Sequence, residues 1–269
     1  MVNLEKVVNK TPVVVDKGTS LNRAIEILLS RGISHLLVSD ASRIIGVLSE
    51  KDILSKICTI RTWKVDLGSL QVSSFYISPF YKVSYDDSLY HVIESIVKNS
   101  YGIVPVFKDE KLIGVVSKQD LMKIALKYRN KSLSKIVTYR PIIASANDRI
   151  FDLRDKIVRE KISIIPIIEQ LKVVGQVTDI RLLDVVTFIY NRFPWNIRER
   201  RARRMIARDI MQRKYDRLDE RESIAQAANM FSTRGSKGIL IFKNDNFTGI
   251  VTKTDILQYI LYTEGSKIE

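Results

Sequence analysis

The chain has 269 residues, of which 45% are hydrophobic and 28% charged, and a formal net charge of +14. These values are typical of a globular protein with one large or two ordinary domains. No apolar run approaches the ~18 residues of a membrane-spanning helix, and the start lacks the apolar core of a secretory signal, so we expect a cytoplasmic protein. The single cysteine, Cys58, excludes an internal disulfide, and two histidines are too few for a typical zinc site, so no metal is expected.

Internal repeats dominate the sequence. Four segments align without gaps over 21–52, 89–120, 150–181 and 224–255. In each, a glycine lies 25 residues after the first apolar residue, and a Ser or Thr follows it three residues later. Repetition in one register indicates four copies of one structural unit.

Taken in chain order, the elements of one repeat are the same in all four. A short strand opens it, as at 12–15 or 141–144. The apolar spacing of Leu21, Ala24, Ile25 and Leu28 then predicts a helix. Two short strands joined by a turn follow, and a second helix begins at the Ser or Thr. The order β-α-β-β-α predicts an α/β (α+β) fold.

A unit of this size has too small a core to be stable alone, so we expect the repeats to pair into two modules. The polar junction at 127–131 predicts the division between them. We place the domains at 1–62, 63–128, 129–190 and 207–269, with a basic linker at 191–206.

Each repeat ends in Gly-x-apolar-[Ser/Thr]-x-x-Asp, or a variant of it. The copies are GVLSEKD (46–52), GVVSKQD (114–120), GQVTDIR (175–181) and GIVTKTD (249–255). The glycine lets a ligand or another backbone approach the strand. The Ser or Thr stands at a helix start, where a hydroxyl and free N–H groups favour an anion, and the aspartate one turn later suits a ribose diol. Together they predict a nucleotide site, with a simple helix-capping box as the alternative.

The chain resembles the cystathionine-beta-synthase (CBS) domain family in these four motif ends, in the strand entry KTPVVV (10–15) and in the segment ARDIMQRK (207–214). The resemblance implies that the repeats pair into modules whose clefts take AMP, ADP, ATP or S-adenosylmethionine. A four-copy chain without a catalytic domain is similar in plan to the gamma subunit of AMP-activated protein kinase, which implies two modules closed as a flat disc.

The same resemblance implies the site residues. Phosphate contacts are expected from Ser49, Ser117 and Thr252, and ribose contacts from Asp52, Asp120 and Asp255. Further residues expected near the phosphates or the nucleotide are Thr11, Ser34, His35 and Lys237. Lys237 and His35 have plain structural alternatives, as a solvated turn lysine and a packed strand histidine.

The third repeat departs from the pattern. Arg181 stands where the other copies have the aspartate, and a guanidinium cannot accept a hydrogen bond from a diol. Asp179 lies about 200° around the helix and cannot simply replace it. We therefore expect the cleft with Thr178 and Arg181 to bind nucleotide weakly or not at all.

Between Arg192 and Lys214 there are nine basic residues and two acids. Pro194 and Trp195 break the preceding helix, and a new helix is predicted over 197–211. A solvated linker helix, a nucleic-acid surface and a dock for an acidic partner protein all remain open, since no base-reading motif is present.

No nucleophile elbow, P-loop or HExxH motif occurs, so we expect no enzyme activity and no catalytic cofactor. The expected function is adenine-nucleotide sensing, with AMP, ADP or ATP as ligands and a regulated partner protein. The alternatives are S-adenosylmethionine binding and a nucleic-acid or protein adaptor built on 198–214. A homodimer is an expected assembly, and no membrane contact is expected.

Overall fold

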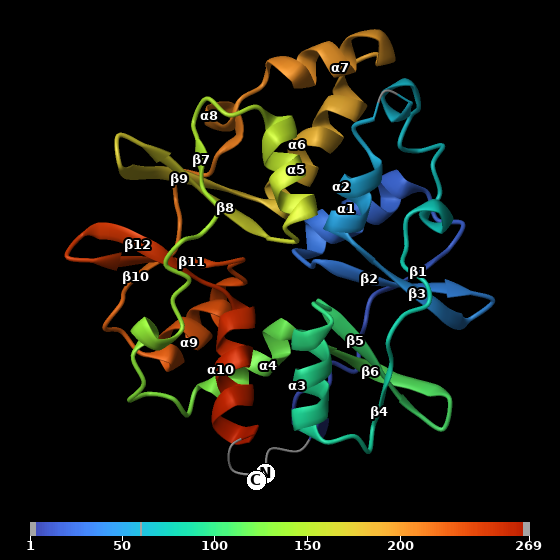
Figure 1. Cartoon of the computed structure of the whole chain (residues 1–269). Coiled ribbons are helices and arrows are strands. Elements are labelled where there is room, and N and C mark those ends of the chain that lie inside the picture. Colours follow the sequence, from blue (N-terminus) through green and yellow to red (C-terminus); the bar gives the residue numbers. More distant parts are fainter. Residues whose placement is uncertain (1–3, 60, 266–269) are drawn as a thin grey trace. The chain divides into compact units, whose positions relative to one another are not determined.

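The computed structural model describes residues 4–59 and 61–265, so the outer ends of the first and fourth expected domains, 1–3 and 266–269, lie outside the described residues. It contains the four expected β-α-β-β-α repeats (Figure 1). The first has β1 (Val14–Asp16), α1 (Leu21–Arg31), β2 (His35–Asp40), β3 (Arg43–Ser49) and α2 (Glu50–Lys56). The second has β4 (Val83–Ser84), α3 (Leu89–Lys98), β5 (Ile103–Lys108), β6 (Lys111–Ser117) and α4 (Lys118–Ala125).

The third repeat has β7 (Ala144–Ser145), α5 (Ile150–Arg159), β8 (Ile164–Glu169), β9 (Lys172–Thr178) and α6 (Asp179–Arg192). The fourth has β10 (Arg217–Asp219), α9 (Ile224–Arg234), β11 (Ile239–Lys243), β12 (Asn246–Val251) and α10 (Lys253–Gly265). Short 3-10 turns are η1 (Leu4–Lys6), η2 (Thr62–Lys64), η3 (Val72–Ser74) and η4 (Leu133–Lys135). Each repeat forms its own three-stranded sheet, in which the first strand is parallel to the second and the second antiparallel to the third.

Local sequence explains where the first helix of each repeat begins. Ser20, Ser88 and Ser223 are N-caps whose hydroxyls accept a hydrogen bond from the N–H three residues later. In the third repeat the carboxylate of Asp152 accepts from the N–H of Arg149 instead. The helices α1 and α9 end at Gly32 and Gly235, which take the left-handed conformation.

The repeats form two compact units, and these are not consecutive halves of the chain. The 1/3 unit comprises Val13–Phe80 and Ile142–Tyr215, with one core built from the first and third repeats. The 2/4 unit comprises Met1–Pro12, Tyr81–Pro141 and Asp216–Glu269, with a second core from the second and fourth. The division that we expected at 127–131 is therefore wrong for the compact units, because the apolar helix faces pack between alternate repeats.

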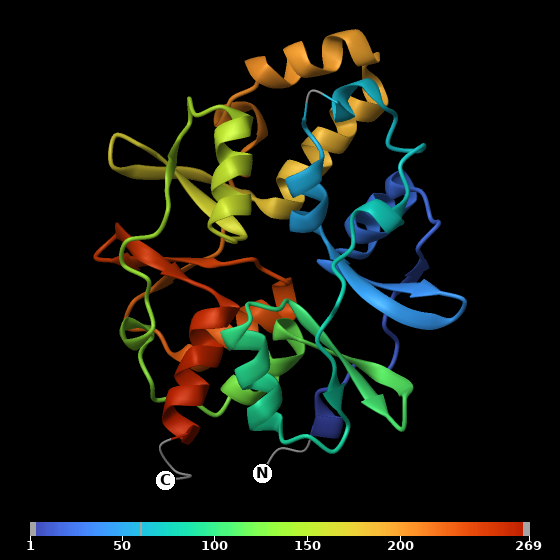
Figure 2. The same cartoon turned by 45° about the vertical axis from the view of Figure 1, so that its right-hand side comes forward.

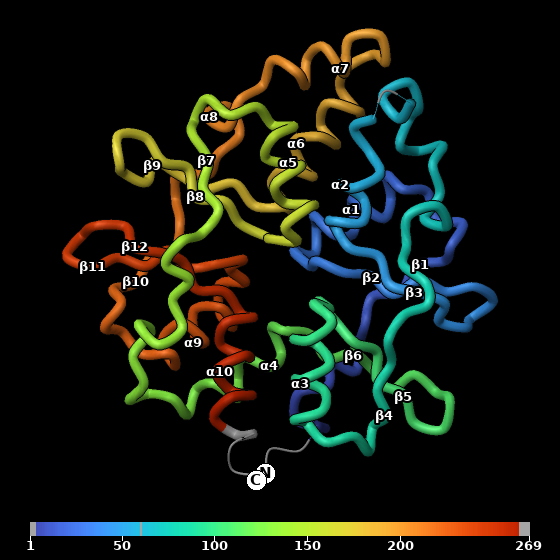
Figure 3. The backbone as a smooth tube through the Cα atoms, viewed as in Figure 1, coloured from blue at the N-terminus to red at the C-terminus, as the bar shows by residue number. Residues whose placement is uncertain are grey.

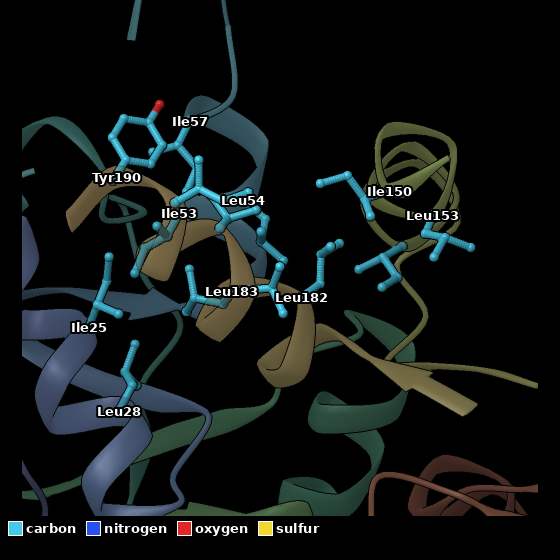
Figure 4. Packing of buried hydrophobic residues seen from close by; sticks show 14 of the residues in the cluster. Ile25, Leu28, Ile53, Leu54, Ile57, Ile150, Leu153, Leu182, Leu183 and Tyr190 are labelled. Carbon is cyan, nitrogen blue, oxygen red and sulfur yellow. The ribbon is translucent and has the colours of Figure 1, made fainter. Parts of the chain in front are cut away.

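Figure 4 shows the core of the 1/3 unit. Ile53 and Leu54 of α2 point toward Leu182 and Leu183 of α6, and all four side chains are fully buried. Leu153 of α5 belongs to the same buried cluster. Burying one such side chain stabilises the fold by roughly 1.5–3 kcal/mol, so the helices hold the two repeats together.

Consecutive repeats are linked in a different way. Each repeat is preceded by an opening segment. This segment belongs to one compact unit, and the repeat that follows it belongs to the other. The four opening segments are residues 4–12, 72–80, 133–141 and 206–215. These segments can be followed in Figure 3. Isolated β-bridges place them beside the motif strands: Asn9 with Val115, Ile77 with Val47, Thr138 with Ile250, and Gln212 with Gln176. The first and second repeats thus exchange opening segments, as do the third and fourth.

The motif glycine makes this exchange sterically possible. A Cβ on Gly114 would lie 2.3 Å from the carbonyl oxygen of Asn9, and one on Gly249 would lie 2.4 Å from that of Thr138. The other two glycines meet the same kind of neighbour, Gly46 the carbonyl oxygen of Ile77 at 2.6 Å and Gly175 that of Gln212 at 2.9 Å. The sequence allowed either a ligand or another backbone beside this glycine. The structure shows another backbone there.

A polar contact also joins the first and third repeats inside the 1/3 unit. The Nζ of Lys51 lies 2.6 Å from the Oγ of Ser163 and 3.3 Å from a carboxylate oxygen of Asp179. The side chain of Asp179 is 1% exposed and that of Lys51 is 29% exposed. A carboxylate this deeply buried requires a cationic partner, which Lys51 supplies across the repeat boundary.

The basic linker packs against the 1/3 unit. It contains α7 (Trp195–Arg204), which contacts α5, α6 and η2 (Figure 2), and it is followed by α8 (Ala207–Ile210). The single helix expected over 197–211 is wrong, because Met205 and Ile206 are extended. The carbonyl of Met205 accepts from the N–H of Ile150, so the break is fixed by pairing with the start of α5.

We expect Gly249→Ala to destabilise the protein by roughly 1–3 kcal/mol, because its new Cβ overlaps the carbonyl oxygen of Thr138 and must displace that backbone. Urea unfolding measures the change. Gly68→Ala is the matched control, since a Cβ there meets nothing within 4 Å. Equal stability of the two variants would contradict the close packing of the opening segment.

We expect Lys51→Met to destabilise the 1/3 unit, because it removes the ion pair between Lys51 and the buried carboxylate of Asp179. Breaking a buried pair costs about 3–5 kcal/mol, and the partial exposure of Lys51 places the cost at the lower end. The double variant Lys51→Met/Asp179→Asn should recover much of the loss in the same urea titration. A double variant less stable than Lys51→Met would show that the ion pair is not the cause.

Candidate functional site

The second helix of the first, second and fourth repeats begins at the motif Ser or Thr, and the motif aspartate binds back to it. The Oδ2 of Asp52 accepts from the N–H of Ser49 at 2.7 Å and from its hydroxyl at 2.6 Å. The same two contacts join Asp120 to Ser117 and Asp255 to Thr252. The capping box that the sequence left open is therefore present in the first and second repeats, and in the fourth the aspartate makes its half of the same arrangement.

The capping contacts engage only half of each carboxylate. Within the described part of the chain, the Oδ1 atoms of Asp52 and Asp120 accept no hydrogen bond. The Oδ1 of Asp255 accepts from the hydroxyl of Thr138 at a long 3.4 Å. The first two aspartates thus keep one open acceptor beside a fixed hydroxyl.

Burial raises the pKa of two of these carboxylates. It raises the pKa of Asp52 above its ordinary value, and the hydrogen bonds from Ser49 oppose the rise. It also raises the pKa of Asp255, against the hydrogen bonds from Thr252. A further hydroxyl donating to either carboxylate would favour its charged form and lower its pKa.

In the first repeat the structure brings four expected residues together. His35 lies opposite Ser49 in the antiparallel pairing of β2 and β3, and Ser34 directly precedes it. Ser34, His35, Ser49 and Asp52 are all half-buried at this end of the sheet. In the fourth repeat Lys237 occupies the corresponding end, two residues before the residue that pairs with Val251.

Thr11 is placed with the second repeat. It lies in the opening segment 4–12, whose Asn9 pairs with Val115, two residues before Ser117. The N–H and hydroxyl of Thr11 both donate to the side-chain oxygen of Asn9. Thr11 therefore belongs with Ser117 and Asp120 rather than with the first-repeat motif.

Sequence reasoning missed Thr138, which the structure places against Asp255. Thr138 occupies the position in its opening segment that Asn9 occupies in the first, since each stands three residues before a proline, Pro141 and Pro12. Aligning the opening segments on these prolines would have identified both polar side chains.

The third repeat is built differently. Thr178 still accepts from the N–H of Arg181. The Nε of Arg181 donates to the carbonyl of Ile210 at 3.0 Å, and its guanidinium donates to Asp184 at 2.7 Å. The arginine thus ties the motif helix to the opening segment 206–215, and it offers donors where the other repeats offer an acceptor.

Other chemistry is limited in the residues that the structure describes. They contain no group of three or more His, Cys, Asp or Glu arranged to hold a metal ion. Burial raises the pKa of the Cys58 thiol to about 12, so it stays protonated at neutral pH. Over 4–59 and 61–265, none of the helices has the length and apolar character to cross a membrane.

Comparison with known proteins gives three informative relatives. A protein of Methanocaldococcus jannaschii is 25% identical over 174 residues, covering 62% of this chain and 61% of that protein. A second from the same organism is 23% identical over 278 residues, covering 99% of this chain and 64% of that protein. An A-adding tRNA nucleotidyltransferase of Geobacter sulfurreducens is 26% identical over 106 residues, covering 39% of this chain and 11% of the enzyme. This chain thus spans less than two thirds of the length of each.

The crystal structure of the first relative, described as a candidate archaeal homologue of g-AMPK, matches with a TM-score of 0.85. The match covers 96% of this chain and 100% of that one at 18% identity, and so establishes the fold alone. Four stretches, 4–58, 72–127, 133–187 and 207–262, match the family described as the CBS domain. Since these stretches make up most of the sequence, the chain belongs to the CBS domain family and carries four copies of that domain in series.

Proposed function

We propose that the chain is a regulatory protein that binds adenine nucleotides through its first, second and fourth repeats and catalyses no reaction on them. The observation that carries the proposal is the half-used carboxylate at the start of the motif helix. Oδ2 of Asp52 and of Asp120 holds the helix cap, while Oδ1 accepts nothing from the described residues. One carboxylate oxygen is thereby fixed in place and open to a ligand.

The chemistry of the site suits a phosphorylated nucleoside. A ribose hydroxyl that donates to Oδ1 would stabilise the charged carboxylate and so oppose the rise in the pKa of Asp52 that burial causes. His35 stands opposite Ser49 in the pairing of β2 and β3, and its ring offers a polar group to a phosphate, whereas the hydroxyl of Ser49 already donates its proton to Asp52. These groups support one ligand held by its sugar at one end and its phosphate at the other.

A phosphate-bearing ligand is favoured over S-adenosylmethionine. Both carry the ribose that the aspartate would hold, but S-adenosylmethionine brings a positive sulfonium where the nucleotide brings an anion. Lys237 at the fourth repeat and the net charge of +14 favour the anion.

Regulation would follow from a shift between conformations. A nucleotide that binds one arrangement of the repeats more tightly than another shifts the population by that difference in affinity. The opening segments are suited to transmit the shift, since each contacts a motif strand and belongs to the repeat that follows. We propose that a partner protein reads the resulting change.

Nucleotide binding is testable by thermal unfolding with AMP, ADP, ATP or S-adenosylmethionine. A ligand at a hundredfold excess over its Kd should stabilise the protein by about 2.7 kcal/mol. Asp52→Ala and Asp120→Ala should each reduce the stabilisation. Asp152→Ala is the matched control, because Asp152 also accepts from an N-cap N–H but lies outside the motif. No stabilisation by any adenosine compound would refute the proposal, as would equal loss in the control.

The third repeat should add no nucleotide. We expect Arg181→Ala to leave the number of bound nucleotides in calorimetry unchanged, while Asp255→Ala lowers it. The same Arg181→Ala change should destabilise the fold by about 1 kcal/mol, because the carbonyl of Ile210 loses its donor. Loss of a nucleotide in Arg181→Ala would show instead that the third repeat binds ligand through its arginine.

A further inference from the structure

The lysine inside the motif of the first repeat is held by the third repeat. Lys51 lies between Ser49 and Asp52, in the first turn of α2. Its Nζ donates to the Oγ of Ser163 at 2.6 Å and lies 3.3 Å from the Oδ2 of Asp179. Both partners come from the third repeat, Ser163 just before β8 and Asp179 at the start of α6. The ammonium within the first candidate motif is therefore engaged by a repeat that we expect to bind no nucleotide.

The two partners from the third repeat are fixed, whereas the lysine reaches solvent. The N–H of Asp179 donates to the carbonyl of Ser163 at 3.2 Å, and the Oδ1 of Asp179 accepts from the N–H of Ile180 at 2.8 Å. The side chain of Asp179 is 1% exposed, but that of Lys51 is 29% exposed. A lysine has a flexible four-carbon stem and three donors, so it can exchange one anion for another. Lys51 is thus the member of the contact that can move.

The proposed ligand brings a second anion to the same lysine. His35 pairs with Ser49, so a phosphate beside the ring of His35 would lie at the end of β3, two residues before Lys51. A phosphate monoester carries close to two negative charges at neutral pH and attracts an ammonium more strongly than one carboxylate does. Lysine binds phosphate as a point charge, which requires no fixed orientation. Ligand and Asp179 would therefore compete for Lys51.

We propose that Asp179 and Ser163 form an autoinhibitory contact, which withholds Lys51 from the phosphate of a nucleotide at the first repeat. This role rests on the proposed function, because it requires a phosphorylated ligand at the motif of the first repeat. The free energy needed to take Lys51 from Asp179 lowers the affinity for that ligand. By linkage, a bound ligand weakens the contact between the first and third repeats by the same factor. The third repeat thereby regulates a nucleotide that it does not hold.

The 2/4 unit has different residues at both positions. Gln119 stands where the first repeat has Lys51, and its amide donates to the carbonyls of Phe231 and Ser232 at 2.6 and 3.2 Å. Lys253 stands where the third repeat has an aspartate. A neutral amide and a cation cannot form the ion pair of the 1/3 unit, so we expect the competition at the first repeat alone.

Calorimetric titration with AMP measures the competition in the variant Asp120→Ala/Asp255→Ala, which leaves the first repeat as the one proposed site. Adding Asp179→Asn to this variant should tighten AMP binding roughly fivefold or more, because Lys51 is released to the phosphate. Adenosine has no phosphate, so its affinity should be the same with and without Asp179→Asn.

Three further changes in the same background separate charge from contact. Asp184→Asn removes one charge from the same helix, but its carboxylate pairs with Arg181 at 2.7 Å, so the AMP affinity should not change. Ser163→Ala changes no charge and should tighten AMP binding by less than Asp179→Asn does. The double variant Lys51→Met/Asp179→Asn should bind AMP more weakly than Asp179→Asn, because the phosphate has lost its cation.

Each of four outcomes would overturn the autoinhibitory contact while leaving the proposed function standing. AMP binding that is unchanged or weaker in Asp179→Asn would show that no competition exists. Equal tightening in Asp184→Asn would reduce the effect to net charge, and equal tightening of adenosine would show that the phosphate is not involved. Equal AMP binding with and without Lys51→Met would show that the lysine does not reach the ligand. If neither AMP nor adenosine bound the unaltered protein, the proposed function would fail, and the contact would have nothing to regulate.

Discussion

The structure depends on the close approach of each opening segment to the motif strand of a neighbouring repeat. Without a side chain on Gly114 or Gly249, a backbone carbonyl fits within 2.4 Å of where a Cβ would stand. This contact links consecutive repeats, whereas the apolar helices link alternate ones. In each repeat, the motif strand therefore contacts the opening segment of one other repeat, and the helices pack against those of a different one. A repeat detached from the chain would lose both, which is the physical reason for a series of four.

The same strand end carries the candidate site, and the proposed ligand would use the carboxylate oxygen next to the one that caps the helix. The cap engages Oδ2 of Asp52 and leaves Oδ1 open, and the cap itself fixes the position of Oδ1. A ligand that donates to Oδ1 would thus meet an acceptor already ordered by the helix start, and less conformational entropy would be lost on binding. In the fourth repeat Thr138 donates to the Oδ1 of Asp255 at 3.4 Å, which gives its opening segment a direct contact with the candidate site. Helix capping by the motif is therefore compatible with the ligand binding that we propose.

The sequence predicted what is local and could not predict what depends on three dimensions. The β-α-β-β-α order and the helix starts at Ser49, Ser117 and Thr178 follow from spacing and capping chemistry, which act within a few residues. The packing of alternate repeats through their helices was not predicted, because all four repeats have similar apolar helix faces and nothing in their spacing selects a partner. The contact of Thr138 with Asp255 joins positions 117 residues apart, beyond any local pattern. The break at Met205 was missed for the same reason, since a contact with Ile150 imposes it.

The departures from fourfold regularity gather in the 1/3 unit and are physically connected. Among the described residues, only the passage from the third repeat to the fourth contains an additional helix of the length of α7 before the opening segment begins. That opening segment starts with α8, whose last carbonyl, at Ile210, is the acceptor for Arg181. Arg181, which stands where the other repeats have the motif aspartate, therefore also anchors the segment that follows α7. A carboxylate at 181 could not hold that carbonyl, because it only accepts hydrogen bonds. In place of the motif aspartate, the third repeat thus has a side chain that holds the segment following the basic helix.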